Sequence, residues 1–262
     1  MLIIIGLGLH DEKDITLRGL ELARSCDELY AEFYTSILGG TFLEKISALI
    51  GKEIKLLDRK DLEENADNSI LKDARSKKVG LLVAGDPLIS TTHVQVRLQA
   101  NELGIETRVV HNASIYSASA SISGLQNYKF GKSASIPFPE EGYIPETPYD
   151  VIKENTARGL HTLLFLDIKV EEGHRLMPAN EAIDILLNIE EKRREGIITK
   201  ETLCVVLGNV GSLDCVLRAG KVKELMDQDF GPAPHSLIVL GKLHFIEEEY
   251  LREFAGLGAR RD

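Results

Sequence analysis

The chain has 262 residues, and its 31 Lys and Arg against 41 Asp and Glu give a formal net charge of −10 at pH 7. An acidic surface repels phosphate backbones, so we expect no direct binding to nucleic acid. The composition, with 44% hydrophobic and 27% charged residues, is typical of a globular chain, and no apolar run approaches the roughly 18–20 residues of a membrane-spanning helix.

The first predicted element is a strand at residues 2–5, an apolar run of the kind that is covered on both faces of a sheet. It follows Met1 without a basic segment, so we interpret it as a strand and not as a secretory signal peptide. The three cysteines, Cys26, Cys204 and Cys215, are odd in number and show no CxxC spacing. We therefore expect them to be small core residues with free thiols, as in a protein of the reducing cytoplasm.

Four glycines further along the chain each stand between a helical pattern and the next apolar run. They are Gly51 before residues 54–57, Gly104 before 105–110, Gly159 before 162–166 and Gly196 before the run at 202–207. Because glycine tolerates the left-handed conformation that ends a helix, we predict C-terminal caps at all four. Strands that alternate with helices imply crossover connections, so the pattern predicts an α/β fold with a largely parallel sheet.

A domain boundary is predicted near the middle of the chain, whose length allows either one large α/β domain or two of ordinary size. Half of the eight prolines fall within residues 137–148, and a segment rich in serine and alanine at 113–124 precedes them. We therefore predict an N-terminal α/β domain at residues 1–112 and a C-terminal α/β domain at 113–262.

Two glycine-bearing loops follow predicted strands in the first half. Gly6-Leu7-Gly8-Leu9 lacks the third glycine of a GxGxxG fingerprint, since position 11 is Asp, so a pyrophosphate cradle is not predicted. The glycines still allow either an ordinary tight turn or close approach of a ligand to the backbone. Gly85-Asp86-Pro87 follows the run at 80–84, as a second turn or as part of the same binding edge.

Two further polar residues follow predicted strands. Ser114 comes after the strand at 107–111, where it suits either a helix N-cap or a ligand contact. Asp167 directly follows the run at 163–166, where its carboxylate could either belong to a binding site or cap the next turn. The seven histidines show no HxxxH or HExxH spacing, so we predict no metal site. The sequence also lacks a GxSxG elbow and a Walker A motif.

Longer stretches distributed over nearly the whole chain resemble the diphthine synthase family. In the first half they are the first glycine loop with Asp11–Thr16, and residues 31–36, 85–88, 91–93 and 114–117. In the second half they are residues 128–133, 149–155, 161–169, 218–220 and 241–244. Gly208-Asn209-Val210 departs from the Ala-Arg-Ala that is more frequent in the family.

This family belongs to the tetrapyrrole-methylase-like class of S-adenosylmethionine (SAM) methyltransferases. The resemblance implies two α/β domains with SAM in the cleft between them, and a homodimer. It implies as substrate the 2-(3-amino-3-carboxypropyl)-histidine of translation elongation factor 2, methylated on its amino nitrogen in the diphthine-forming step of diphthamide biosynthesis. Trimethylation of that nitrogen is expected, with S-adenosylhomocysteine as the product of the donor.

The resemblance also implies a set of SAM-binding residues, many through backbone contacts: Leu9, Asp86, Ile89, Ser114, Ile115, Leu166, Val210 and His235. No catalytic residue is assigned. His10, Asp86 and Asp167 are candidates for a general base by position alone. Two alternative functions stay open, a methylase of a small precorrin-type tetrapyrrole and a SAM- or nucleotide-binding module without catalysis.

Overall fold

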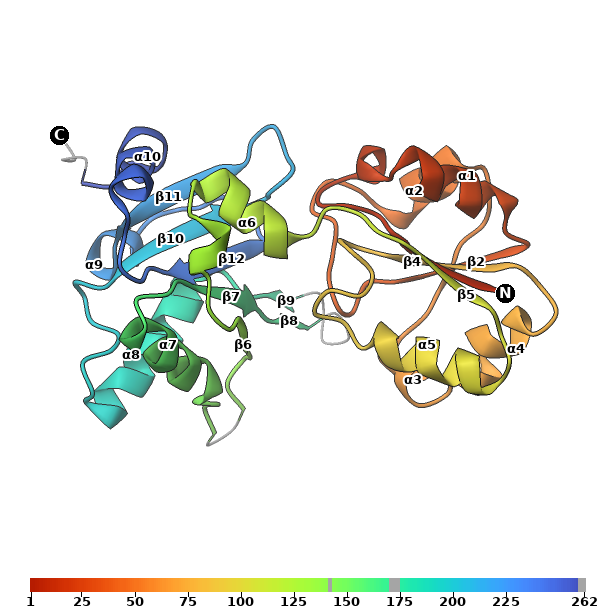
Figure 1. Ribbon diagram of the computed structural model, residues 1–262, viewed down its shortest axis with the longest axis horizontal. Helices are drawn as coiled ribbons and strands as arrows, with labels where there is room; N and C mark the ends of the chain where they lie inside the picture. Colours follow the sequence, from red (N-terminus) through yellow and green to blue (C-terminus); the bar gives the residue numbers. More distant parts are fainter. Residues whose placement is uncertain (141–142, 170–174, 259–262) are drawn as a thin grey trace. The chain divides into compact units, whose positions relative to one another are not determined.

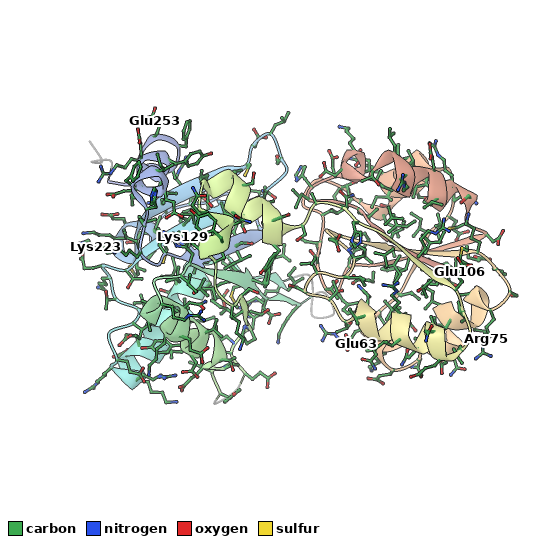
Figure 2. All side chains as sticks on the ribbon, in the orientation of Figure 1. Glu63, Arg75, Glu106, Lys129, Lys223 and Glu253 are labelled. Atoms are coloured by element: carbon green, nitrogen blue, oxygen red, sulfur yellow. The ribbon has the colours of Figure 1, made fainter. Side chains whose placement is uncertain are left out.

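The computed structural model describes residues 1–140, 143–169 and 175–258 (Figure 1). The chain forms two compact units, Met1–Ile115 and Tyr116–Asp262, here called unit 1 and unit 2. The division lies three residues after the domain boundary that we predict from the prolines. Charged side chains such as Glu63 and Glu253 point outward from their helices (Figure 2). No helix among the described residues is both long enough and apolar enough to cross a membrane.

Unit 1 contains a five-stranded sheet with the order β3-β2-β4-β1-β5, in which every pair is parallel. Its strands are β1 (Leu2–Gly6), β2 (Glu28–Glu32), β3 (Lys55–Leu56), β4 (Val79–Val83) and β5 (Thr107–Val110). Strand β1 pairs with both β4 and β5. The predicted first strand and the predicted parallel sheet are therefore confirmed in this unit.

Helices cover both faces of this sheet (Figure 1). They are α1 (Leu17–Ser25), α2 (Leu43–Ile50), α3 (Arg59–Glu63), α4 (Ile70–Ala74) and α5 (His93–Glu102), with the 3-10 turns η1 (Glu12–Asp14) and η2 (Ala66–Asn68). Successive side chains of a strand alternate between faces, and β1 shows the result. Ile3 and Ile5 pack in the core beneath α1 and α2, whereas Leu2 and Ile4 pack in the core beneath α4 and α5. Burial on both sides explains why β1 is continuously apolar.

Unit 2 contains a second five-stranded sheet, with the order β11-β10-β12-β7-β6. Its strands are β6 (Ala134–Ile136), β7 (Thr162–Leu166), β10 (Leu203–Gly208), β11 (Val216–Lys221) and β12 (His235–Val239), and a small hairpin is formed by β8 (Ile168–Lys169) and β9 (Arg175–Leu176). Among the described strand pairs of unit 2, β6 and β7 alone are parallel. The prediction of a largely parallel sheet is wrong here, because seven residues between β10 and β11 are too few for a crossover.

The helices of unit 2 also lie on both faces of their sheet (Figure 1). They are α6 (Ile115–Ser123), α7 (Thr147–Ala157), α8 (Ala179–Arg193), α9 (Val222–Leu225) and α10 (Phe245–Ala255), with the 3-10 turn η3 (Asn127–Lys129). Residues of α7 and α8 form one core with Leu164 and Leu237. Residues of α6 and α10 contribute to the core on the other face, around Leu163 and Ile238.

The predicted glycine caps all adopt left-handed backbone angles, with φ of 80° at Gly51, 68° at Gly104, 70° at Gly159 and 72° at Gly196. Helix α8 differs in one respect, because Arg194 takes the left-handed cap position itself, with φ 56°. The three cysteines are free, with Cys26 and Cys204 buried and Cys215 half-buried. Burial raises the pKa of the Cys204 thiol to about 12, so it is an inert core residue.

Candidate functional site

The carboxyl ends of three neighbouring strands of unit 1 meet at one edge of its sheet, here called the unit 1 edge. The register places Gly6 of β1 beside Val83 of β4, and Ile5 beside Val110 of β5. Four of the predicted SAM-binding residues, Leu9, Asp86, Ile89 and Ser114, lie in the loops that follow these strands, and a fifth, Ile115, begins helix α6 directly after the last loop. Open parallel sheets bind ligands outside this end of their strands.

The two glycine loops at the unit 1 edge are hydrogen-bonded to each other. Gly8 N donates to Gly85 O at 3.3 Å, and Gly85 N donates to Gly8 O at 2.7 Å. A Cβ on Gly6 would lie 2.6 Å from Gly85 O, and one on Gly8 would lie 2.4 Å from Asp14 Cβ. The first loop therefore needs its glycines for packing within the protein, which favours the tight-turn interpretation for it.

Gly85 is different, because its surroundings are open. It has φ +73°, and the nearest atom to a Cβ placed there would be Ser114 Cβ at 4.0 Å. Backbone conformation alone selects glycine at this position. The space beside Gly85 is thus available to a ligand at the unit 1 edge.

Asp14 and Asn112 tie the three loops together. Asp14 Oδ2 accepts hydrogen bonds from the backbone N–H groups of Leu9 at 3.2 Å and His10 at 2.7 Å. Asn112 Nδ2 donates to Gly6 O at 2.9 Å and to Asp14 O at 3.0 Å. The sequence analysis missed both residues as part of the site. The only local signal was the Asp11-x-x-Asp14 spacing, which forms a capping box at η1.

Asp86 joins the loop after β4 to the loop after β5. Its Oδ2 accepts from His111 Nδ1 at 2.9 Å and from Asn112 N at 3.3 Å, and its Oδ1 accepts from Leu88 N at 3.2 Å. An ionised carboxylate only accepts, so His111 carries its proton on Nδ1 here. Asp86 is 7% exposed. Its carboxylate holds the loop after β4 and the loop after β5 together.

The remaining predicted residues come together at one edge of the unit 2 sheet, here called the unit 2 edge. His235, the first residue of β12, pairs with Gly208 at the end of β10, and Ser236 pairs with Phe165, which precedes Leu166. Val210 follows Gly208 by two residues. Leu166 and His235 are buried and Val210 is half-buried. The structure thus gathers the eight predicted residues into one group of five and one group of three.

His235 has a polar atom without a partner. Its Nδ1 accepts a hydrogen bond from Ala179 N at 3.2 Å, so in the neutral ring the proton lies on Nε2. Nε2 is buried and has no hydrogen-bond partner among residues 1–140, 143–169 and 175–258. Burial lowers the pKa of the ring, which keeps it neutral. His235 therefore carries a buried N–H donor that is unsatisfied within the described chain, close to the backbone of residues 230–232.

The other two candidates for a general base are engaged within the fold. Asp167 Oδ2 accepts from Phe138 N at 2.8 Å and Oδ1 accepts from Ile168 N at 2.9 Å, which favours the turn cap over a site residue. The ring of His10 packs against Gly40, where a Cβ would lie 2.2 Å from Nε2. Within the described part of the chain no group of three or more His, Cys, Asp or Glu side chains could hold a metal ion.

Comparisons with known proteins agree over nearly the whole chain. Residues 1–226 match the family model described as tetrapyrrole (corrin/porphyrin) methylases. The chain is 50% identical over 253 residues to the diphthine synthase of Methanocaldococcus jannaschii, which covers 96% of this chain and 98% of that protein. It is 50% identical over 257 residues to the diphthine synthase of Methanocella arvoryzae, with coverage of 98% and 99%. A crystal structure of diphthine synthase matches with a TM-score of 0.89 at 40% identity, covering 98% of this chain and 97% of that chain.

Proposed function

We infer the reaction of this chain from one premise: the chain belongs to the diphthine synthase family of the tetrapyrrole methylases, and it is a SAM-dependent methyltransferase of diphthamide biosynthesis. We propose that its substrate is the 2-(3-amino-3-carboxypropyl)-histidine of translation elongation factor 2, and that it methylates the amino nitrogen of that side chain. The observation that carries this proposal is the 50% identity to diphthine synthases over almost the full length of both chains.

We propose that SAM is held by the residues of the unit 1 edge and of the unit 2 edge. Gly85 offers open space beside a half-buried backbone, and His235 offers a buried N–H that has no hydrogen-bond partner among the described residues. SAM carries a carboxylate, ribose hydroxyls and adenine nitrogens, all of which accept hydrogen bonds. The residues present therefore fit this cofactor. The position of SAM in a cleft between the two domains stays a prediction.

When bound, SAM supplies a methyl carbon that its sulfonium makes electrophilic. The protein's part is mainly to hold the amine in line with that carbon, and good alignment can contribute about 7–11 kcal/mol to lowering a barrier. The amine must be neutral to attack, since its protonated form has no lone pair. Asp86 and Asp167 have their oxygens engaged with donors of the fold. We therefore propose that the proton leaves to solvent and assign no general base.

Four finer points that the family assignment implies are also proposals. We propose that the nitrogen is trimethylated, that S-adenosylhomocysteine is the second product, and that the protein acts in the cytoplasm as a homodimer. The alternative of a small-tetrapyrrole methylase is less well supported, because the curated relatives above are diphthine synthases over nearly their whole length. A non-catalytic SAM-binding module is disfavoured by the same relationship.

The test is methyl transfer to the protein substrate. Purified full-length chain is incubated with methyl-labelled SAM and with elongation factor 2 that carries the aminocarboxypropyl group, and a factor with unmodified histidine serves as the control. We expect label on the modified factor only, and mass spectrometry of the modified peptide counts the methyl groups. Absence of label under conditions where calorimetry shows SAM binding would reject the proposed substrate, and label on a precorrin alone would establish the alternative.

A further inference from the structure

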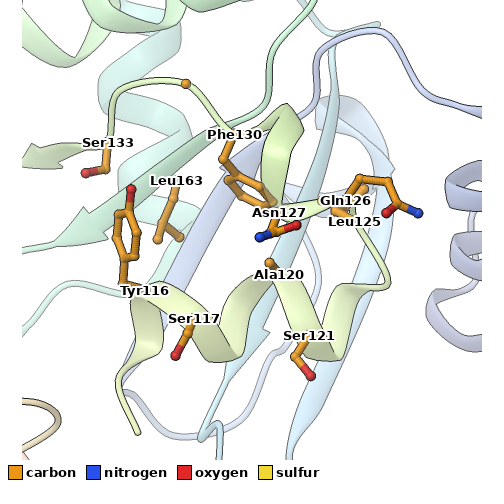
Figure 3. A pocket seen from close by; sticks show the side chains of 11 residues that line it. Tyr116, Ser117, Ala120, Ser121, Leu125, Gln126, Asn127, Phe130, Ser133 and Leu163 are labelled. Atoms are coloured by element: carbon orange, nitrogen blue, oxygen red, sulfur yellow. The ribbon is translucent and has the colours of Figure 1, made fainter. Parts of the chain in front are cut away.

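Unit 2 contains a pocket of about 460 Å³ between α6 and the segment that follows it. Its lining comes from α6, from residues 125–133 and from β7: Tyr116, Ser117, Ala120, Ser121, Leu125, Gln126, Asn127, Phe130, Gly131, Ser133 and Leu163. Figure 3 shows Asn127 and Phe130 projecting toward Ala120 of α6 across the pocket. None of the eight residues that we place in the SAM site lines it. The volume is within the range of ordinary ligand pockets.

The wall opposite α6 is held in place by buried polar contacts. Lys129 Nζ and the backbone N–H of Gln126 both donate to the carboxylate of Glu247, which is completely buried. His161 N donates to Lys129 O at 2.8 Å, and Gly131 N donates to His161 O at 2.9 Å. These contacts fix residues 126–131 from both sides, so the wall is formed before any ligand arrives.

A second clamp holds the end of the same wall. Asn155 Nδ2 donates to Lys132 O at 2.8 Å, and Lys132 N donates to Asn155 Oδ1 at 3.2 Å. A Cβ on Gly131 would lie 2.0 Å from Asn155 Oδ1, so only glycine allows this approach. A preformed pocket loses little conformational entropy when it binds a ligand.

The lining has a definite chemistry. Its walls are apolar and aromatic, from Leu125, Phe130, Leu163 and Ala120, and its polar groups are hydroxyls and amides. Among the described residues that line it, none is charged, although the whole chain carries a formal charge of −10. A charged group buried here would lack a counter-charge, which is costly. The pocket therefore suits a neutral segment that combines apolar surface with hydrogen-bonding amides.

We propose that this pocket binds an uncharged peptide segment of the protein substrate, with an apolar side chain inserted toward Phe130 and Leu163. This inference rests on the proposed function, in which the substrate is one side chain of a large protein. The reacting aminocarboxypropyl group is charged at both its amine and its carboxylate, so it does not suit the pocket. Main-chain amides next to it do, because Asn127 and Gln126 offer both donors and acceptors.

Continuity of the chain supports this occupant. Helix α6 begins at Ile115, one of the proposed SAM contacts, and the lining of the pocket begins at the next residue, Tyr116. Tyr116 is 48% exposed, so a peptide can reach it. A protein substrate anchored along α6 would have its flanking segment held by the same helix whose first turn contributes to the cofactor site.

The experiment compares pocket variants in steady-state kinetics on elongation factor 2 that carries the aminocarboxypropyl group, at saturating SAM. Tyr116→Ala removes an aromatic wall, and Ala120→Phe fills the pocket from the helix side. Tyr143→Ala is the matched control, since Tyr143 is 62% exposed in unit 2 and does not line the pocket. Calorimetry gives the Kd for SAM, circular dichroism the folded state, and light scattering the molecular mass.

We expect both pocket variants to raise the KM for the protein substrate at least tenfold with kcat nearly unchanged, as when uniform binding is removed. The Kd for SAM should stay within twofold, and Tyr143→Ala should match the parent chain. An unchanged KM in a folded variant would overturn the inference. So would a weakened SAM affinity, which would place the pocket in the cofactor site, or a changed molecular mass, which would assign it to a second copy. Failure of the parent chain to bind SAM or to methylate the factor would instead overturn the proposed function, and this inference with it.

Discussion

Gly85 and Gly8 show how the same residue type serves two purposes at one edge. Gly8 is required because Asp14 lies against it, whereas Gly85 has φ +73° and open space beside it. The sequence placed both in loops after strands but could not tell these cases apart. The three-dimensional surroundings decide between them, since Asp14 packs against Gly8 whereas the nearest neighbour of Gly85 is Ser114, from the loop after β5.

Replacing Gly85 with alanine separates backbone strain from ligand binding. The left-handed conformation costs a non-glycine residue about 1–2 kcal/mol, so Gly85→Ala should lower the free energy of unfolding by that amount. The added methyl group would also occupy the space proposed for SAM, and we expect the Kd for SAM to rise about tenfold in calorimetry. Gly104→Ala is the matched control, with φ +68° and no atom within 4 Å of its Cβ. It should show the strain without the loss of affinity, and equal SAM affinity in both variants would remove Gly85 from the site.

The unpartnered N–H of His235 gives a second prediction at this scale. His235→Phe keeps a planar ring but removes the Nε2–H donor, together with the Nδ1 that accepts from Ala179 N. A neutral hydrogen bond contributes about 0.5–1.5 kcal/mol, so we expect the Kd for SAM to rise by up to about one order of magnitude. His235→Gln retains a donor and should lose less affinity. Titration calorimetry below the unfolding temperature of each variant measures this, and a Kd for His235→Phe equal to that of the parent would show that Nε2 does not contact SAM.

The loops of the unit 1 edge behave as one element because side chains join them. Asn112 donates to carbonyl groups of residues that lie 106 and 98 positions away in the sequence. Such partners have no signature in local sequence, so the loops could be predicted and their joining could not. The sequence analysis placed Asp86 in the loop after the run at 80–84, and in the structure its carboxylate accepts hydrogen bonds from His111 and Asn112.

Removing the hydrogen bonds of Asn112 should destabilise all three loops of the unit 1 edge. Asn112→Ala leaves two carbonyl groups without their donor, and we expect a loss of about 1–3 kcal/mol in the free energy of unfolding. We also expect the Kd for SAM to rise about tenfold, because the loops no longer hold one geometry. Asn101→Ala, at an exposed position of α5, is the control and should change neither quantity. Urea denaturation and calorimetry provide both values. Full SAM affinity in a destabilised Asn112→Ala variant would show that the hydrogen bonds of Asn112 do not support SAM binding.

In unit 2 the pattern of apolar residues predicts where strands lie but not their direction or their order in the sheet. Apolar runs and glycine caps located β7 and β10 correctly, as they did β1 and β4 in unit 1. They could not reveal that β11 returns beside β10 after only seven residues, or that β12 lies between β10 and β7. Connection length controls direction, and β11 contains Arg218 and Gly220, so its pattern did not read as a buried strand.

At the scale of the whole molecule, the described part of unit 2 contains two buried neutral histidines, His161 and His235, and we expect them to couple its stability to pH. His161 is completely buried, accepts from Gly241 N at Nδ1 and faces Glu247, with Lys129 nearby. Burial lowers its pKa from the ordinary value of 6.5, and Lys129 adds to the effect while Glu247 opposes it. Burial also lowers the pKa of His235, opposed by backbone carbonyls and Asp229.

The sign of the pH effect follows from these two lowered pKa values. As the pH falls below about 6.5, the unfolded chain takes up protons at His161 and His235 before the folded chain does, so unfolding becomes more favourable. Stability from this source is complete above pH 6.5. It declines at lower pH by at most about 1.4 kcal/mol per pH unit for each histidine, until the folded-state pKa is reached.

Hydrogen exchange, corrected for intrinsic rates, tests this in the native full-length chain. Amides of β7 and β12 should lose protection between pH 7.5 and pH 5.5. His161→Gln keeps a donor toward Glu247 but does not titrate, so its protection should be lower at pH 7.5 and should change less with pH than that of the parent. A histidine-independent loss, from carboxylates such as Glu247 with its pKa lowered to about 2, should begin only as the pH falls below about 4.5. Equal pH slopes in the parent and in His161→Gln would exclude His161 as a source of the coupling.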